Sequence, residues 1–273
     1  MLTFLLAELK EDDIRTRAQS MSFSFFLAIF PSIIVLFTAI AYLPLSGQEE
    51  VLFNELQEFM PSDAGTFIYD TVNDLIQIPR GGLLSIGFIL AIVFSSNGMI
   101  TMMKGFEKSY ELTFKKRGFI AKRLIAIWLT FLLGVLLLLS VSLIILSKYL
   151  LNDLLAPLQL DKISPFLLHI LRWTVIILLF YSVLTSIYRF GPPLKEKFGP
   201  FTPGATLATI LSIMSSLAFS YFIDNFGSYN KIYGSIGALI VTLIWLEINC
   251  FVILVGFELN ASIAINRDLK SLD

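Results

Sequence analysis

Charged residues are scarce in this chain. Only 15% of its 273 residues are Asp, Glu, Lys or Arg, whereas soluble globular proteins carry roughly 25%. Hydrophobic residues make up 56% of the chain and include 25 phenylalanines, and the mean hydropathy is +0.80. A soluble fold of this size would struggle to bury so much apolar surface, so the composition predicts a membrane protein.

Cysteine and histidine are almost absent. Cys250 and His169 are the only residues of their kinds, which excludes a disulfide within the chain and leaves no ligand cluster for zinc. We therefore expect no metal and no cofactor. A net charge of −1 gives no basic field that would attract nucleic acid. Residues 1–17 carry four acids and no small-residue cleavage site follows them, so we expect no signal peptide.

Long apolar stretches dominate what remains. A membrane-spanning helix needs about 20 mostly apolar residues. Six stretches qualify, at about residues 18–43, 83–103, 122–147, 165–188, 203–222 and 234–262. Backbone groups in lipid must bond within their own segment, and none of the stretches alternates in polarity as a barrel strand would. The sequence therefore predicts an all-α membrane protein with six transmembrane helices in a domain spanning residues 18–264.

Three further segments lie outside the predicted spans. Residues 1–17 resemble an amphipathic interfacial helix, and residues 265–273 form a short tail. Residues 49–78 carry seven acids between recurring apolar positions, which predicts an outer amphipathic helical hairpin that lies on the membrane surface or caps the bundle.

The distribution of basic residues predicts the orientation. Of 20 Lys and Arg residues, 15 fall in the N-terminal segment, the 104–123 and 189–202 loops and the tail, and four fall on the other side. Because basic loops stay inside, both termini are expected in the cytoplasm. An even number of spans places both termini on the same side, which agrees with this expectation.

The 104–123 loop is the most basic segment. Its cluster comprises Lys115, Lys116, Arg117, Lys122 and Arg123. Nucleic-acid binding is one interpretation of such a loop. Contact with anionic lipid headgroups requires fewer assumptions, so we expect membrane lipids as partners and no nucleic acid.

The stretch "TLIWLEINCFVILVGFELN", residues 242–260, places carboxylates in an apolar run. Glu247 lies about 20 Å into the last span, slightly past the midplane. An ionised carboxylate there costs roughly 2.5–3.5 kcal/mol. It is therefore either a protonated residue bonded to a neighbouring helix or part of a polar cavity or proton path. Glu258 follows eleven residues later, on the same helix face, and Asn249 and Asn260 repeat this spacing.

Other polar or helix-breaking residues fall at the same depth. Asn97 lies about 21 Å into the second span, and Pro31 is expected to break the first span. Such features near the midplane are typical of transporter sites. Arg172, in the fourth span, either snorkels to the outer interface or pairs with Glu247.

Small residues recur in the fifth and sixth spans. Gly204, Ala208, Ser212 and Ser216 lie four residues apart, and Gly234 and Gly237 lie at the start of the sixth span. We expect these residues to allow close helix packing.

Three parts of the sequence resemble the YihY/BrkB family of bacterial inner-membrane proteins. They are "FGSYNKIYGSIGALIVTLIWLEINCFVILVGFELNA" near the C-terminus, "DDIRTRAQSMSFSFFLAIFPSI" near the N-terminus, and "YRFGPP" with "FTPGATLAT" between them. The resemblance implies six spans in the cytoplasmic membrane. The family has carried a ribonuclease BN label, but a single His and no metal-ligand cluster leave no visible nuclease site.

These features favour transport or translocation of a lipid-like or small amphiphilic substrate. Candidates for a substrate or proton pathway are Glu247, Glu258, Asn97, Asn249, Asn260 and Arg172. The alternative is a scaffold or envelope-assembly partner, in which the polar residues only hold helices together. A homo-oligomer or an envelope partner fits either alternative. An enzyme is not expected, because no nucleophile–base pair appears.

Overall fold

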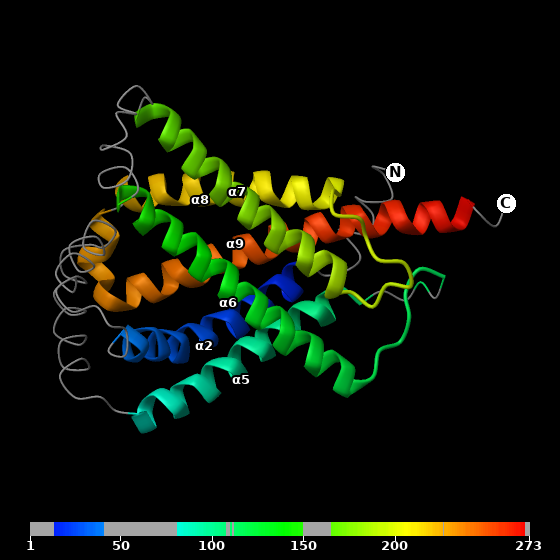
Figure 1. Ribbon diagram of the computed structural model, residues 1–273, viewed down its shortest axis with the longest axis horizontal. Coiled ribbons are helices and arrows are strands. Elements are labelled where there is room, and N and C mark those ends of the chain that lie inside the picture. The colour runs from blue at the N-terminus through cyan, green and yellow to red at the C-terminus, as the bar shows by residue number, and fades with distance from the viewer. Residues whose placement is uncertain are drawn as a thin grey trace. The chain divides into compact units, whose positions relative to one another are not determined.

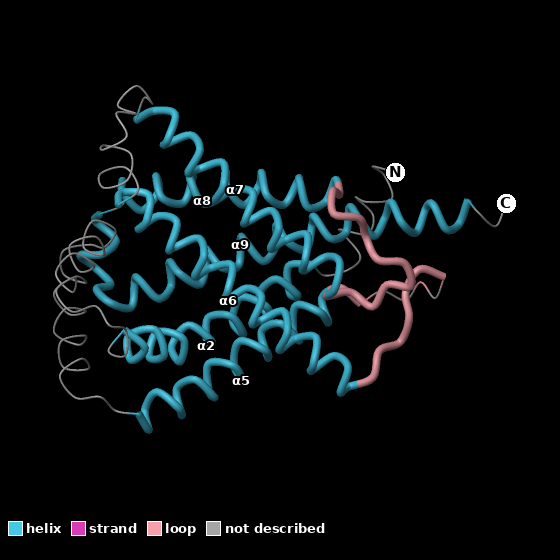
Figure 2. Tube along the Cα trace, in the orientation of Figure 1, coloured by secondary structure: helices cyan, strands magenta, loops and turns pink. Residues whose placement is uncertain are grey.

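The computed structural model describes residues 14–40, 81–107, 110, 112–149, 165–225 and 227–270 (Figures 1 and 2). Their regular structure consists of helices, apart from an isolated antiparallel bridge between Phe114 and Leu194. The helices are α2 (Ile14–Ile40), α5 (Gly81–Gly105), α6 (Phe119–Tyr149), α7 (Pro165–Phe190), α8 (Pro203–Asn225) and α9 (Gly227–Lys270). The predicted all-α class is confirmed.

Five of these helices are long and apolar enough to span a membrane. The candidate spans are Ser85–Gly105, Phe119–Leu136, Trp173–Phe190, Pro203–Phe222 and Leu239–Lys270. They match five of the six predicted spans. The first predicted span falls on α2, which is not among the five. The predicted hairpin at residues 49–78 lies outside the described residues, as does most of the N-terminal segment.

The last helix is longer than expected. It runs to Lys270, so residues 265–270, predicted as part of a tail, continue the helix. Arg267 and Lys270 occupy its final turn, where positive charge interacts favourably with the negative end of the helix dipole.

The chain divides into two units. One comprises residues 1–24 and 96–273, and the other comprises residues 25–95. In the second unit, α2 continues through Pro31 without interruption, so the predicted helix break is not observed there. Proline has no N–H to donate within a helix. One residue on, the Ser32 hydroxyl donates a 2.8 Å bond to the Ala28 carbonyl.

In the first unit, few residues of the spans are buried inside the protein. Only 11% of the span Phe119–Leu136 is buried inside the protein. Exposed apolar residues include Phe131 on α6 and Met214 and Leu217 on α8. A contiguous apolar surface of this extent is not tolerated in water. It fits a bundle whose outer faces contact lipid.

The end of α7 and the start of α8 pack closely against α9 in this unit. Figure 1 shows α8 lying along α9. A Cβ added at Gly256 would lie 2.5 Å from the Tyr188 hydroxyl, 2.6 Å from the Gly204 carbonyl and 2.8 Å from the Ala208 Cβ. Backbones can approach this closely only where side chains are absent or small.

Aromatic rings fill the space beside this helix contact. The Phe106 and Phe257 ring centroids are 4.4 Å apart, and the Tyr188 hydroxyl donates a 2.7 Å bond to the Ile253 carbonyl. All three aromatic residues are fully buried. Gly237 is also buried in α9, whereas the surroundings of Gly234 lie outside the described residues.

Candidate functional site

A group of polar side chains from α2 and α9 surrounds Glu247. Gln19 Nε2 donates a 3.1 Å hydrogen bond to Glu247 Oε1, and Arg15 Nε lies 3.8 Å from the same oxygen. We call Arg15, Gln19 and Glu247 the lateral polar patch. It joins the first turns of α2 to the first half of the α9 span.

The lateral polar patch lies on an exposed apolar surface. The Glu247 side chain is 32% exposed and that of Arg15 is 81% exposed. Ile244, Ile248 and Phe251 are exposed beside Glu247 on α9, at spacings that place them on one helix face. The carboxylate of Glu247, within the span Leu239–Lys270, is therefore partly exposed on an apolar face of α9.

The pairing of Glu247 with Arg172, considered from the sequence, stays a prediction. Arg172 lies on α7, and its side chain is outside the described residues. The cation beside Glu247 comes from Arg15, which sequence reasoning assigned to an interfacial segment. The only available signal was that Arg15 and Gln19 lie four residues apart, and therefore on one helix face.

Glu258 has different surroundings from Glu247, although the two share a helical face by spacing. Its side chain is only 1% exposed. Arg17 Nη1 donates a 3.4 Å bond to the Gly105 carbonyl, and a Cβ at Gly105 would lie 3.1 Å from Leu254, one turn before Glu258. The Arg17 guanidinium thus lies near the part of the core that contains the Glu258 carboxyl group.

Asn260 forms hydrogen bonds with the first residues of α8. Its Oδ1 accepts a 2.8 Å bond from the Gly204 N–H, and its Nδ2 donates a 3.0 Å bond to Thr202 Oγ1. Thr202 Oγ1 also accepts a bond from the Ala205 N–H, so it caps the helix in the usual way. Asn260 is therefore a buried link between α8 and α9.

Three other polar residues of α8 and α9, Asn249, Ser216 and Ser212, have different surroundings. Asn249 Nδ2 donates to the Trp245 carbonyl of its own helix, and Trp245 Nε1 donates to Ser216 Oγ across the helix interface at 3.3 Å. Ser212 is buried, and its Oγ has no hydrogen-bond partner among the described residues. These contacts follow the small-residue stripe of α8.

Asn97 joins α5 to α6. Its Oδ1 accepts a 2.5 Å bond from Arg123 Nη1, and its carbonyl accepts one from Thr101, whose hydroxyl in turn accepts a bond from Ser24. A row of polar groups thus connects α2, α5 and α6. Arg123, which the sequence predicts to contact lipid headgroups, donates to the Asn97 side chain in the structure.

Arg117 clamps the loop after α7. Its guanidinium donates to the carbonyls of Phe190, Gly191 and Pro192 at 3.3, 2.9 and 3.1 Å. Burial lowers the pKa of Arg117, and the nearby Glu107 carboxylate opposes this shift. Glu107 also forms an ion pair with Lys122. Of the five basic residues assigned to headgroups, Lys115 and Lys116 keep exposed side chains.

The loops at 106–118 and 191–202 pair with each other, as the adjoining pink segments of Figure 2 show. The Lys115 N–H donates to the Pro193 carbonyl at 2.8 Å, and the Lys195 N–H donates to the Thr113 carbonyl at 3.0 Å. We call these two segments the paired loops. Periodicity could not predict their pairing, because neither segment reads as a strand.

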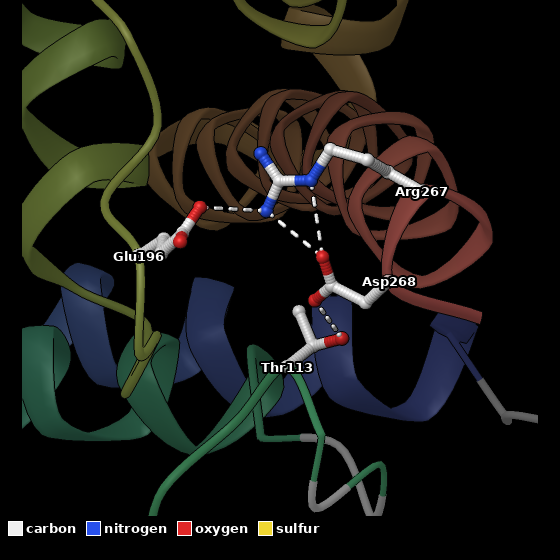
Figure 3. Close-up of polar contacts among 4 residues, drawn as sticks. All are labelled: Thr113, Glu196, Arg267 and Asp268. Carbon is white, nitrogen blue, oxygen red and sulfur yellow. Dashed lines mark hydrogen bonds and ion pairs between the residues drawn. The ribbon is translucent and has the colours of Figure 1, made fainter. Parts of the chain in front are cut away.

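The end of α9 holds the paired loops together (Figure 3). Thr113 donates a 2.8 Å bond to Asp268. Arg267 contacts Asp268 at 2.9 Å and Glu196 at 3.0 Å. The last turn of α9 therefore contacts both loops. Within the described residues, no three His, Cys, Asp or Glu side chains form a group that could hold a metal ion.

Comparison with known proteins is consistent with the membrane architecture. The chain is 30% identical over 252 residues to the ribonuclease-like protein YfkH of Bacillus subtilis, covering 90% of this chain and 89% of that one. A UPF0761 membrane protein of Photobacterium profundum is 26% identical over 96% of this chain and 80% of its own length. Another, from Coxiella burnetii, is 25% identical over 96% of this chain and 92% of its own length. No solved structure matches.

A family model covers nearly the whole sequence. The model described as virulence factor BrkB matches residues 5–272. The quoted stretches "YRFGPP", "FTPGATLAT" and "VGFELNA" meet where α7, α8 and α9 pack together. The chain belongs to the virulence factor BrkB family and is a multi-pass membrane protein.

Proposed function

We propose that this protein transports or translocates a lipid-like or small amphiphilic substrate, and that the lateral polar patch is its substrate site. The supporting observation is a partly exposed charge pair, Arg15 and Glu247, on an apolar membrane-facing surface. Ionisable groups at membrane depth are costly and commonly mark substrate or ion pathways.

An amphiphile suits a site that opens sideways. Its headgroup needs polar partners while it crosses the bilayer, and its acyl chains do not. Arg15, Gln19 and Glu247 supply polar groups, and the exposed Ile244, Ile248 and Phe251 supply an apolar surface beside them. The acyl chains can therefore stay in lipid while the headgroup contacts the lateral polar patch.

Membrane lipids are also proposed as partners at the paired loops. Lys115, Lys116, Lys195 and Lys197 are exposed there, next to the exposed aromatic residues Phe119 and Phe201. Lysines attract anionic headgroups, and aromatic rings favour the membrane interface. We place this end of the bundle, with both termini, on the cytoplasmic side.

A translocation assay tests the proposal. Purified protein is reconstituted into vesicles that carry an acyl-labelled fluorescent phospholipid, and dithionite added outside quenches the label in the outer leaflet. We expect faster loss of the inner-leaflet signal than in protein-free vesicles, and a slower loss with Glu247→Gln. A wild-type protein that matches protein-free vesicles for lipid and for other amphiphiles would refute the proposal.

A scaffold is the second candidate function. It is favoured by the buried positions of Glu258 and Asn260, because Asn260 ties α8 to α9. A scaffold predicts no translocation and stable recovery of a partner or second copy after crosslinking. We propose no enzymatic activity; the word ribonuclease belongs to the name of a relative, and release of nucleotides from RNA by the purified protein would contradict this.

A further inference from the structure

We propose that the lateral polar patch selects phospholipids whose headgroup carries an amine, with the phosphate at Arg15 and the ammonium group at Glu247. This inference rests on the proposed function and names its substrate class. The inference follows from three properties of the patch. One acid lies beside one base, the distance between their charged groups is long, and the Arg15 side chain is more exposed than that of Glu247.

The contact between the two charges is long. Arg15 Nε and Glu247 Oε1 are 3.8 Å apart, whereas a charge-assisted N–H···O bond is about 2.7–2.9 Å long. An exposed pair of this kind contributes little to stability. A ligand that offers each group a closer partner of opposite charge can therefore replace the pair.

Gln19 fixes the carboxylate and leaves one oxygen for a ligand. Both contacts of Glu247 fall on Oε1, so Oε2 has no protein partner among the described residues. The Gln19 amide donates to Oε1 at 3.1 Å, which orients the carboxylate without neutralising it. An ammonium group, with three donors, can bind Oε2 or both oxygens.

Arg15 is suited to the phosphate. Its side chain is 81% exposed, and a planar guanidinium can bind two phosphate oxygens at once. A zwitterionic headgroup would leave the occupied patch with no net charge. A phosphate without an amine would bring a second negative charge close to Glu247, which is unfavourable in a low dielectric.

Headgroup preference provides the test. Translocation rates are measured for two acyl-labelled lipids, phosphatidylethanolamine and phosphatidylglycerol, in vesicles of the same bulk composition. We expect the wild type to favour the ethanolamine lipid, and Glu247→Gln to reduce this preference by about threefold, the scale of a partly screened charge pair. Arg15→Gln should slow both lipids.

Glu196→Gln is the matched control. Glu196 is an exposed acid that also lies beside an arginine, Arg267, but at the paired loops. Its substitution removes the same charge from the protein and should leave the lipid preference unchanged.

The outcomes separate this inference from the proposed function. If neither lipid moves faster than in protein-free vesicles, the proposed function fails. If both lipids move at equal rates, or if Glu247→Gln and Glu196→Gln give the same preference as the wild type, translocation stands and the amine-selective site is wrong.

Discussion

Single residues decide how closely α8 and α9 approach. Gly204 and Gly256 face each other where the two backbones meet, and Ala208 continues the contact. Asn260 bonds to the backbone exposed by the absence of a side chain at Gly204. Backbone contact and backbone hydrogen bonding thus occur at the same place, and both need a residue with no Cβ.

Gly256→Ala is therefore expected to destabilise the protein. The new methyl group would meet a carbonyl oxygen and a hydroxyl, so the helices would have to separate, at a cost of about 1–3 kcal/mol. Gly134→Ala is the matched control, because nothing lies within 4 Å of a Cβ there and alanine is the better helix former. Thermal unfolding in detergent should give a lower midpoint for Gly256→Ala and an equal or higher one for Gly134→Ala. Equal midpoints for both variants would contradict the close approach.

At the scale of elements, the sequence predicts where the spans lie better than it predicts which residues contact each other between helices. The apolar runs behind α5, α6, α7, α8 and α9 are long, and charged residues limit them, so their positions follow from composition and length. Helix rotation and tilt depend on contacts between distant segments. For this reason the patterns could identify Glu247 as unusual but could not identify Arg15 and Gln19 as its neighbours.

The basic loop illustrates the same limit. Charge counting assigned Arg117, Lys122 and Arg123 to lipid headgroups, yet all three contact protein groups. An arginine that binds backbone carbonyls has the same sequence signal as one that binds phosphate. For Arg117, the position of the loop after α7 distinguishes the two.

Arg117→Lys is expected to loosen the paired loops. Lysine keeps the charge, but it lacks the guanidinium fork that reaches three carbonyls. We expect faster amide hydrogen exchange at residues 190, 191, 194 and 195 of the variant. Lys116→Ala removes an exposed charge from the same loop and is the control. An unchanged exchange rate in Arg117→Lys would show that the clamp does not hold the loop.

For the whole molecule, the sequence predicts an orientation in the membrane. Basic residues gather at the paired loops, which predicts that these loops lie in the cytoplasm. Cys250, the only cysteine, is buried in α9, so the wild-type chain provides a background with little labelling.

Cysteine labelling can measure this orientation. Lys116→Cys and Lys197→Cys each place an exposed thiol on one of the paired loops. We expect a membrane-impermeant maleimide to label both variants only after the cells are permeabilised, because the reagent cannot cross the membrane. Labelling of both variants in intact cells would reverse the proposed orientation.

The length of α9 has a practical consequence for imaging. Its 44 residues extend about 66 Å at 1.5 Å per residue, whereas the hydrocarbon core is about 30 Å thick. The helix is therefore about twice as long as the hydrocarbon core is thick, and it ends at Lys270. A helical fusion partner joined in phase at Lys270 would be carried as a rigid extension. Such a fusion would give a 30.7 kDa membrane protein the added mass and the asymmetric shape by which single particles are aligned in electron microscopy.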